Sequence, residues 1–249
     1  MKPLAIDLFA GLGGWTDGLL AEGWDVVGFD IERHDYGTGG YPAQLVLQDI
    51  RTIHGKQFRD AALIVASPPC QEYSYMAMPW SRAKAIRAEY LAGTRDRAKL
   101  TELFDACFRI QREAIEAAGH FIPLVVENVR GAQPWVGRSR ANFGSYHLWG
   151  DVPALMPDTA RTPKMSGRGM SLGDVPWGPH HTGLNERATK NTGGSWLGVD
   201  PRGNRIEPNN GRRGSKSSAR KAASAAIAKI PLPLARHIAQ AWWSREVRR

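Results

Sequence analysis

Short apolar runs alternate with amphipathic or glycine-rich stretches along the first half of the chain. Polar positions rarely interrupt these runs, which is typical of strands that helices cover on both faces of a parallel sheet. The apolar runs predict strands at 4–9, 24–29, 45–47, 63–66 and 124–126. Helical patterns predict helices at 14–21 and 98–117. This order of elements predicts a doubly wound α/β domain, which binds ligands at the carboxyl ends of its strands.

Chemically distinctive residues lie within or just after those predicted strand ends. They are Asp7, Gly11, Asp30, Asp49, Cys70 and Glu127. Glycines after the first strand allow a tight turn before a helix, whose N-terminus favours an anionic group. Nucleotide binders and sulfonium-cofactor enzymes share such a turn. Asp30 is suited to ribose hydroxyls, and Asp49 with Ile50 to an adenine ring. The alternative for each single acid is a helix cap or a surface charge.

Two prolines lead directly to a cysteine in the segment 66–71, Ala-Ser-Pro-Pro-Cys-Gln. Each proline ring restricts φ, so the segment before the Cys70 thiol loses little freedom on folding. This stiffness suits a nucleophile that must approach one substrate atom from one direction. A buried structural cysteine is the alternative. Glu127 ends an apolar strand and is a candidate proton donor opposite the thiolate, the alternative being a paired acid that caps a loop.

Charge and glycine are concentrated late in the chain. The formal net charge is +9, which makes a polyanionic partner plausible. Residues 151–221 carry 12 Lys and Arg against 6 Asp and Glu, and 11 of the 27 glycines. Such a stretch builds little core of its own, so we expect a loop-rich module over a better-packed body. A solvated insertion or linker is the alternative.

The cysteines and the lengths of the apolar segments argue against several classes of protein. Two distant cysteines argue against a disulfide framework and a zinc site, and we expect no metal at His180-His181. Cys107 lies among apolar residues at helical spacing, so we expect it in the core. No apolar segment is long enough to span a bilayer or act as a secretory signal, so we expect no membrane partner and a cytoplasmic location, in a bacterial or phage-infected cell.

Three motifs between residues 7 and 129 together resemble the DNA (cytosine-5) methyltransferase family. They are Asp-Leu-Phe-Ala-Gly-Leu-Gly-Gly at 7–14, Pro-Cys-Gln at 69–71 and Glu-Asn-Val at 127–129. The resemblance implies a Rossmann-like S-adenosylmethionine-dependent fold, with Cys70 as nucleophile at cytosine C6 and Glu127 at N3. It also implies a flipped target base. The implied residues for S-adenosylmethionine, and for its product S-adenosylhomocysteine, are Phe9, Ala10, Gly11, Leu12, Gly13, Asp30, Ile31, Asp49, Ile50 and Pro69.

The chain also departs from the family pattern. Pro68 stands where an aromatic residue is common, and the usual Gln-x-Arg-x-Arg is missing. Arg138 or Arg140 is the candidate for the O2 atom of the base, with a phosphate contact as the alternative. The segment 228–238 resembles the family's closing segment but lacks its Gly-Asn. Residues 72–97 are polar and basic, and we interpret them as a lid over the flipped nucleotide, with a solvated loop leading into a helix as the alternative.

These observations predict a monomer with three regions. Residues 1–150 form the catalytic and cofactor-binding domain, 151–222 a target recognition region, and 223–249 a C-terminal helix that returns to the catalytic domain. The expected substrate is double-stranded DNA, with a short target and a phage or bacterial type of enzyme, in which a cognate restriction nuclease is a compatible partner. The candidate phosphate contacts are Arg202, Arg205, Arg212, Arg213 and Lys216. The alternatives are a tRNA cytosine-5 methyltransferase and a cofactor- and DNA-binding protein without turnover.

Overall fold

The computed structural model describes residues 2–35, 39–70, 73, 80–156, 225 and 228–246. Seven strands of this part of the chain form one sheet in the order β3-β2-β1-β4-β5-β7-β6. The first five in chain order are parallel, and β7 is antiparallel to both β5 and β6. The strands are β1 (Leu4–Leu8), β2 (Asp25–Asp30), β3 (Gln44–Leu47), β4 (Leu63–Ala66), β5 (Leu124–Val129), β6 (Ala141–Phe143) and β7 (Tyr146–Gly150).

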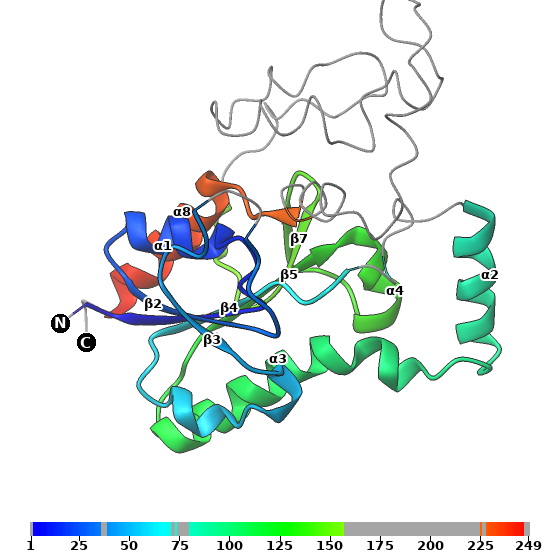
Figure 1. The fold of residues 1–249 in the computed structure, drawn as a ribbon, viewed down its shortest axis with the longest axis horizontal. Helices are drawn as coiled ribbons and strands as arrows, with labels where there is room; N and C mark the ends of the chain where they lie inside the picture. The colour runs from blue at the N-terminus through cyan, green and yellow to red at the C-terminus, as the bar shows by residue number, and fades with distance from the viewer. Residues whose placement is uncertain are drawn as a thin grey trace, which may run out of the picture.

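Helices cover both faces of this sheet (Figure 1). The α-helices are α1 (Gly14–Ala21), α2 (Trp80–Leu91), α3 (Arg97–Ala118), α4 (Gln133–Val136) and α8 (Leu232–Glu246). Short 3-10 helices are η1 (Ile50–Thr52), η2 (Gly55–Phe58) and η4 (Arg130–Ala132). Helices α1 and α8 lie on one face, and α3 lies on the other. Within the described ranges, none of these helices has the length and apolar character needed to cross a bilayer.

The core is divided by the sheet into two clusters. Residues of α1 and α8, such as Leu19 and Leu234, pack with the strand residues Leu63, Val65 and Val125 on one face. The other face packs against α3 and the two 3-10 helices that precede β4. Side chains that alternate along a strand therefore enter opposite clusters, as the period of two requires. The predicted doubly wound α/β fold is confirmed.

Cys107 lies in the second cluster and is fully buried. Its thiol donates a hydrogen bond to the carbonyl oxygen of Leu103, one helical turn earlier, at 3.4 Å. Burial raises the pKa of this thiol well above its usual range. A thiol that stays protonated is a poor nucleophile. The prediction that Cys107 is a core residue is confirmed.

The predicted elements agree with the structure where an apolar run is continuous. The sequence analysis missed elements whose apolar residues do not form such a run. Strand β4 and helix α1 begin and end as predicted, and β5 continues three residues further than expected. Strands β6 and β7 were not predicted, because polar residues interrupt both and β6 has only three residues. Helix α2 lies within the stretch interpreted as a lid, and its mostly exposed surface gave no amphipathic pattern.

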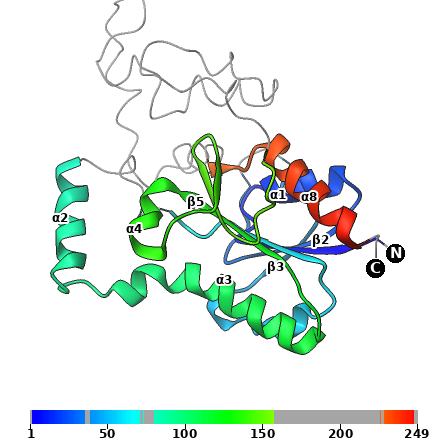
Figure 2. The same ribbon diagram turned by 180° about the vertical axis from the view of Figure 1, so that it is seen from behind.

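Helix α8 returns to the sheet and packs beside α1. Both views show the two helices side by side on the same face (Figure 2). Arg236 of α8 pairs with Glu22, the residue that ends α1. Just before α8, the Lys229 ammonium group lies 2.7 Å from the Asp17 carboxylate. The end of the chain is thus joined to the helix that follows the first strand. The division of the chain into three regions stays a prediction.

Candidate cofactor and catalytic site

The candidate residues converge because the parallel strands end at one edge of the sheet. The chain runs outward from β1 through β2 to β3 on one side, and through β4 to β5 on the other. Strand order therefore reverses between β1 and β4. This reversal opens a crevice at the carboxyl ends, which is where open α/β sheets bind their ligands. The loop after β1 lies on the boundary between the two sides.

The loop 9–13 after β1 is held by its own backbone and by β2. The Ala10 amide donates to the carbonyl oxygen of Phe29 at 3.0 Å, and the Gly13 amide donates to that of Ala10 at 2.8 Å. Phe9 has a φ of 60°, an uncommon conformation for a bulky side chain that persists only where the surroundings determine it. Gly13 has a φ of 71°, and a Cβ there would lie 2.6 Å from Cδ of Pro42. Glycine is thus required at this turn.

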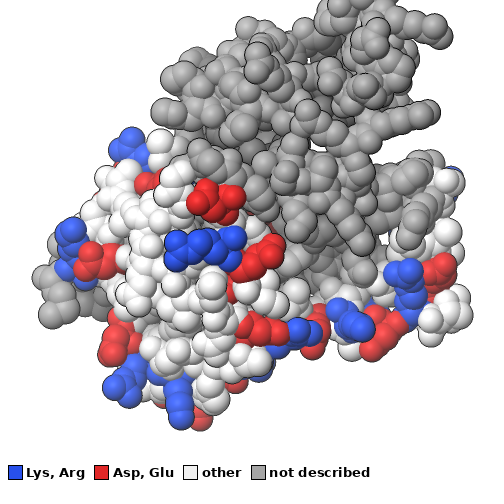
Figure 3. Space-filling view, viewed as in Figure 1, with Lys and Arg blue, Asp and Glu red and all other residues white. Residues whose placement is uncertain are grey.

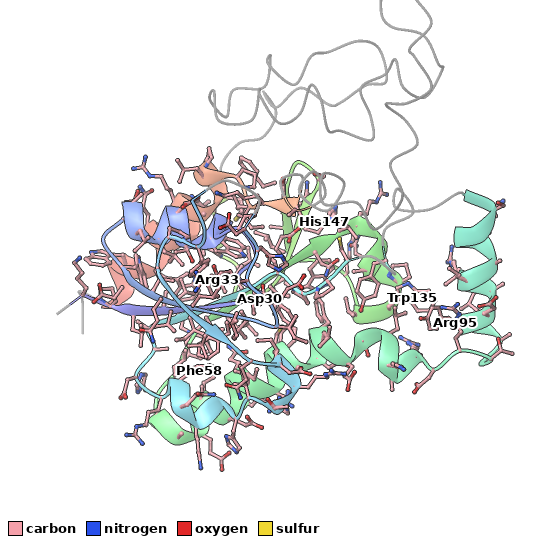
Figure 4. The ribbon with its side chains drawn as sticks, viewed as in Figure 1. Asp30, Arg33, Phe58, Arg95, Trp135 and His147 are labelled. Atoms are coloured by element: carbon pink, nitrogen blue, oxygen red, sulfur yellow. The ribbon has the colours of Figure 1, made fainter. Side chains whose placement is uncertain are left out.

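Asp30, at the end of β2, fixes the same loop. One carboxylate oxygen accepts a hydrogen bond from the Gly11 amide at 2.9 Å, and the other accepts one from the Ile31 amide at 2.7 Å. The His34 imidazole lies 3.4 Å from the second oxygen. The Asp30 carboxylate is mostly buried, while the Ile31 side chain is 68% exposed although it is apolar. Figure 4 labels Asp30 close to Arg33, which lies three residues further along the chain. An apolar surface beside a buried acid suits a nucleoside.

Asp49 and Ile50 differ in their contacts and in their burial. Asp49 caps η1 by accepting a hydrogen bond from the Arg51 amide at 2.9 Å. Its carboxylate also forms a two-contact pair with the Arg51 guanidinium, which lowers the pKa of Asp49. Ile50 is buried in the core. Both follow β3 as expected, and their contact with adenine stays a prediction.

A buried polar cluster lies beneath the loop. Asp7 in β1 accepts a hydrogen bond from the Thr16 hydroxyl at 2.7 Å and from the Tyr41 hydroxyl at 3.3 Å. The two hydroxyl groups also contact each other. A Cβ at Gly28 would lie 2.3 Å from the Tyr41 oxygen, so any larger residue there would displace the Tyr41 ring. Burial raises the pKa of Asp7 to about 7, and the two hydroxyl groups act against that rise.

These residues fit the adenosyl cofactor that the sequence predicts. Gly11 and Gly13 leave the loop without a side chain at two positions, Asp30 is fixed at the neighbouring strand end, and the Ile31 side chain is exposed beside it. One oxygen of Asp7 is buried and has no hydrogen-bond partner among the described residues. Buried acceptors in native proteins are usually satisfied, so an unpaired one close to this loop is consistent with a polar group arriving with a ligand.

The nucleophile segment is anchored on both sides of its prolines. The Ser67 amide donates to the carbonyl oxygen of Leu8 at 3.2 Å, and the Asn128 side-chain amide donates to that of Pro68 at 2.9 Å. The Cys70 carbonyl accepts a hydrogen bond from the Tyr73 amide at 3.0 Å. Pro69 is exposed and Cys70 is half-buried. A substrate therefore has access to this cysteine, unlike Cys107.

Glu127 lies in β5, beside the end of β4. Ala66 is paired with Val126, so the following residues, Ser67 and Glu127, are neighbours in the same register. The carboxyl group is mostly buried, and burial raises its pKa to about 8, while the neighbouring Ser67 hydroxyl acts against that rise. Glu127 is therefore largely protonated at neutral pH. A neutral carboxyl group can donate a proton or a hydrogen bond to a substrate nitrogen.

The structure places the two candidate arginines on the loop that enters β6. Both side chains are exposed, and the Arg140 amide donates to the carbonyl oxygen of Leu148 in β7 at 2.8 Å. Leu148 is the partner of Glu127 in the sheet. Two strand spacings, roughly 10 Å, therefore separate the backbone of Arg140 from that of Glu127. Whether Arg138 or Arg140 contacts the base stays a prediction.

The predicted DNA contacts lie outside the described residues. This holds for Arg202, Arg205, Arg212, Arg213 and Lys216, as well as for the pair His180-His181. On the described part of the face in Figure 3, basic and acidic side chains are interspersed. The cluster of positive charge that the sequence shows in 151–221 thus lies mostly beyond the described chain.

Several residues that shape the site were missed by the sequence analysis. Tyr41 carried no local signal, because it lies between predicted strands and reaches Asp7 only in the folded chain. Trp15 directly follows the motif at 7–14 and Ser67 lies in the segment 66–71, yet nothing in their spacing predicted the bond between the Trp15 indole N–H and the Ser67 hydroxyl, at 2.9 Å. Asn128 directly follows Glu127, and its contact with Pro68 could have been suspected from its amide group alone.

Comparisons with known proteins agree with the motif-based interpretation. Residues 4–89 match the family model of the C-5 cytosine-specific DNA methylase. None of the curated proteins matches the chain. Among solved structures, one match is described as a DNA modification methyltransferase encoded within an E. coli prophage, at 21% identity and a TM-score of 0.36, covering 53% of this chain and 33% of that one.

Two further solved structures match the chain with similar sequence identity, coverage and TM-score. The Dnmt2 methyltransferase of S. pombe is 17% identical, with a TM-score of 0.35, over 55% of this chain and 37% of that one. The methyltransferase EhMeth of Entamoeba histolytica is 18% identical, with a TM-score of 0.35, over 55% of this chain and 41% of that one. The aligned part thus spans less than half of each of these proteins. The matched family model covers both the loop after β1 and the Pro-Pro-Cys segment, so the chain is similar to cytosine-5-specific DNA methylases over these residues.

Proposed function

We propose that this protein transfers a methyl group to C5 of a cytosine flipped out of double-stranded DNA. The observation that carries the proposal is the family match over 4–89, which includes Cys70, together with the buried Glu127 carboxyl group at the adjacent strand end. The proposal extends to the three regions of the chain, with 151–222 as the part that binds DNA through its basic residues.

Cofactor binding falls to the loop 9–13 and the ends of β2 and β3. Asp30 holds the loop in place, and the exposed Ile31 side chain offers an apolar surface beside it. Asp49, Ile50 and Pro69 complete the proposed set. Bound S-adenosylmethionine would supply an electrophilic methyl group for C5.

Cys70 and Glu127 act on the cytosine itself. The Cys70 thiolate adds to C6 while the Glu127 carboxyl group donates its proton, or a hydrogen bond, to N3. The ring electrons displaced by this addition make C5 an enamine carbon that can accept the methyl group. After transfer, N3 returns its proton to Glu127, and loss of the C5 proton to solvent re-forms the C5–C6 double bond as the thiolate leaves. The target must leave the duplex for this chemistry, because a stacked base hides C6.

Labelled methyl transfer tests the proposal directly. The full chain is incubated with labelled S-adenosylmethionine and either duplex DNA or tRNA, and transfer to DNA is the expected result. Transfer to tRNA alone would replace the proposed substrate. DNA that contains 5-fluorocytosine should form a covalent adduct with the wild-type protein, since fluorine at C5 blocks the release step. Cofactor binding without adduct or transfer would instead support a binding protein without turnover.

A further inference from the structure

Tyr41 lies where a crossover helix usually covers two parallel strands. Parallel strands need a crossover connection, and that connection is most often an α-helix. The connection from β2 to β3 has no helix among its described residues, 31–35 and 39–43. The Tyr41 ring lies instead against Gly28 of β2, where an added Cβ would collide with the ring. A single aromatic side chain is thus packed directly on the sheet.

Tyr41 lies on the face of the sheet that α1 covers. Ala5 of β1 and Val26 of β2 belong to the core cluster of that face. Side chains two apart along a strand share a face, so Asp7 and Gly28 lie on the same side. These two residues are also register partners in the adjacent strands. The contact with Gly28 therefore brings the Tyr41 hydroxyl beside the Asp7 carboxyl group.

The Tyr41 hydroxyl connects the two segments that flank the loop 9–13. It donates a hydrogen bond to one Asp7 oxygen at 3.3 Å, and the Thr16 hydroxyl donates to the same oxygen at 2.7 Å. The two hydroxyl groups also contact each other. Asp7 stands two residues before the loop and Thr16 three residues after it, and both are almost fully buried. Both ends of the loop are therefore held at one phenol.

The segment 41–42 also packs on the loop itself. A Cβ at Gly13 would lie 2.6 Å from Cδ of Pro42 and 3.3 Å from a ring carbon of Tyr41. Gly13 is the last residue of the loop, and its amide closes the turn by donating to the carbonyl oxygen of Ala10 at 2.8 Å. The turn that closes the loop is thus in contact with the residues that precede β3.

We infer that Tyr41 is a positioning residue for cofactor binding, and that it acts by holding both ends of the loop 9–13 while packing on Gly13. This inference rests on the proposed function, in which that loop binds S-adenosylmethionine. A loop held in its binding conformation loses less conformational freedom when the ligand arrives, so affinity is higher. In this role Tyr41 itself needs no contact with the cofactor.

Tyr41→Phe tests the hydroxyl group while keeping the ring on Gly28. We expect the Kd of the full chain for S-adenosylhomocysteine, measured by calorimetry, to rise about 10-fold. KM for S-adenosylmethionine should rise by a similar factor, and kcat at saturating cofactor and duplex DNA should stay within about twofold. A variant that only unfolds more easily would lower kcat and leave KM and Kd unchanged, and that result would overturn the inference.

Tyr146→Phe is the matched control. The Tyr146 hydroxyl donates to the carbonyl oxygen of Lys229 at 3.2 Å, and its strand β7 is separated from β1 by β4 and β5. Loss of this hydroxyl should leave the Kd for S-adenosylhomocysteine unchanged. An equal loss of affinity in Tyr146→Phe and Tyr41→Phe would contradict a particular role for Tyr41.

Thr16→Val tests whether the two hydroxyl groups act together. Valine has nearly the shape of threonine but no hydroxyl group, so Asp7 loses its other donor. Groups in one hydrogen-bond network are energetically coupled. The double variant Tyr41→Phe/Thr16→Val should therefore lose less affinity than the product of the two single losses. A loss equal to that product would show that the two residues do not hold the loop as one unit.

Amide hydrogen exchange of the free full chain adds a readout that needs neither ligand nor turnover. The Gly13 amide should exchange about 10-fold faster in Tyr41→Phe, because the loop opens more often. The Arg140 amide, bonded to the carbonyl oxygen of Leu148 at 2.8 Å, should keep its rate. Unchanged exchange at Gly13 would overturn the inference. Absence of cofactor binding by the wild type would instead contradict the proposed function, while the exchange rates would still decide whether Tyr41 holds the loop.

Discussion

The two sides of the sheet edge hold their reactive groups by different means. On the cofactor side, the loop 9–13 is fixed through hydrogen bonds within itself and to β2, with Asp30 at the centre. On the catalytic side, the Cys70 segment is stiffened by two prolines and held at a few backbone oxygens, such as that of Pro68. The first arrangement suits a pocket formed before its ligand arrives. The second holds one side chain in place while leaving space beyond it.

The chain beyond Cys70 extends this contrast. Helix α2 lies apart from the sheet in both ribbon views and approaches the body near its C-terminal end. There the Tyr90 ring packs edge-on against Trp135 of α4, with 5.3 Å between the ring centres. The Arg97 guanidinium lies over the same Trp135 ring and donates to its carbonyl oxygen at 3.0 Å. Figure 4 shows Trp135 and the neighbouring Arg95 on this side of the molecule. Ile86 and Tyr90, both in the C-terminal half of α2, thus join this helix to the body.

Removing the proposed nucleophile should give the largest difference between the two sides, because it should affect methyl transfer and not cofactor binding. We expect Cys70→Ala to lower methyl transfer by roughly four orders of magnitude or more, because no other side chain replaces the thiolate. Its affinity for S-adenosylmethionine should stay within twofold of the wild type, measured by calorimetry. Cys107→Ala is the control, and it should keep activity while lowering stability, since that cysteine is a core residue. Equal activity of Cys70→Ala would disprove the covalent mechanism.

Loosening the loop 9–13 should have the opposite effect to Cys70→Ala, because it should lower cofactor affinity and leave the Cys70 thiol unchanged. Asp30→Ala removes the acceptor of the Gly11 amide, a hydrogen bond to a charged group. We expect cofactor affinity to fall about 10- to 100-fold, and alkylation of Cys70 by iodoacetamide to keep its rate. Asp25→Ala is the control, because Asp25 is exposed at the other end of the same strand. A change in the alkylation rate would show that the two sides are not independent.

Detaching α2 should reduce the reaction with DNA more than it reduces binding of the cofactor. Trp135→Ala removes the ring that Tyr90 and Arg97 contact. We expect kcat/KM for duplex DNA to fall about 3- to 10-fold, consistent with the loss of one aromatic contact, with cofactor affinity unchanged. Phe121→Ala, at a ring that is 45% exposed, serves as the control. An equal loss in both variants would mean that Trp135 has no particular role in holding α2.

The smallest expected effect is on stability as pH changes. The pKa of Glu127 is raised from 4.5 to about 8 in the folded protein. Between these values the folded state holds a proton that the unfolded chain has lost, so raising the pH favours unfolding. We expect the free energy of unfolding in urea to be lower at pH 8 than at pH 7, by roughly 1 kcal/mol. Glu127→Gln should reduce this difference, and Glu116→Gln, at an exposed position, should not.

Much of the fold could be predicted because its strands are continuous apolar segments. Residues 63–66 are buried at every position, so local composition alone identifies them as a strand covered on both faces. Cys70 and Glu127 could be predicted as site candidates for the same reason. Cys70 follows the end of one such strand, and Glu127 is among the last residues of another. The short strands β6 and β7 pair with each other and with β5, and their stability depends on that pairing more than on their own residues.

By itself, the sequence determined which residues stand at the strand ends and which segments are stiff, since apolar runs, glycines and prolines act locally. Tertiary structure alone decided which of those residues meet. Trp15, Ser67 and Glu127 come from α1, the end of β4 and β5, and they become neighbours through strand register and helix packing. Tyr41 reaches Asp7 in the same way. Contacts between distant segments depend on how the whole sheet assembles, and local pattern does not encode them.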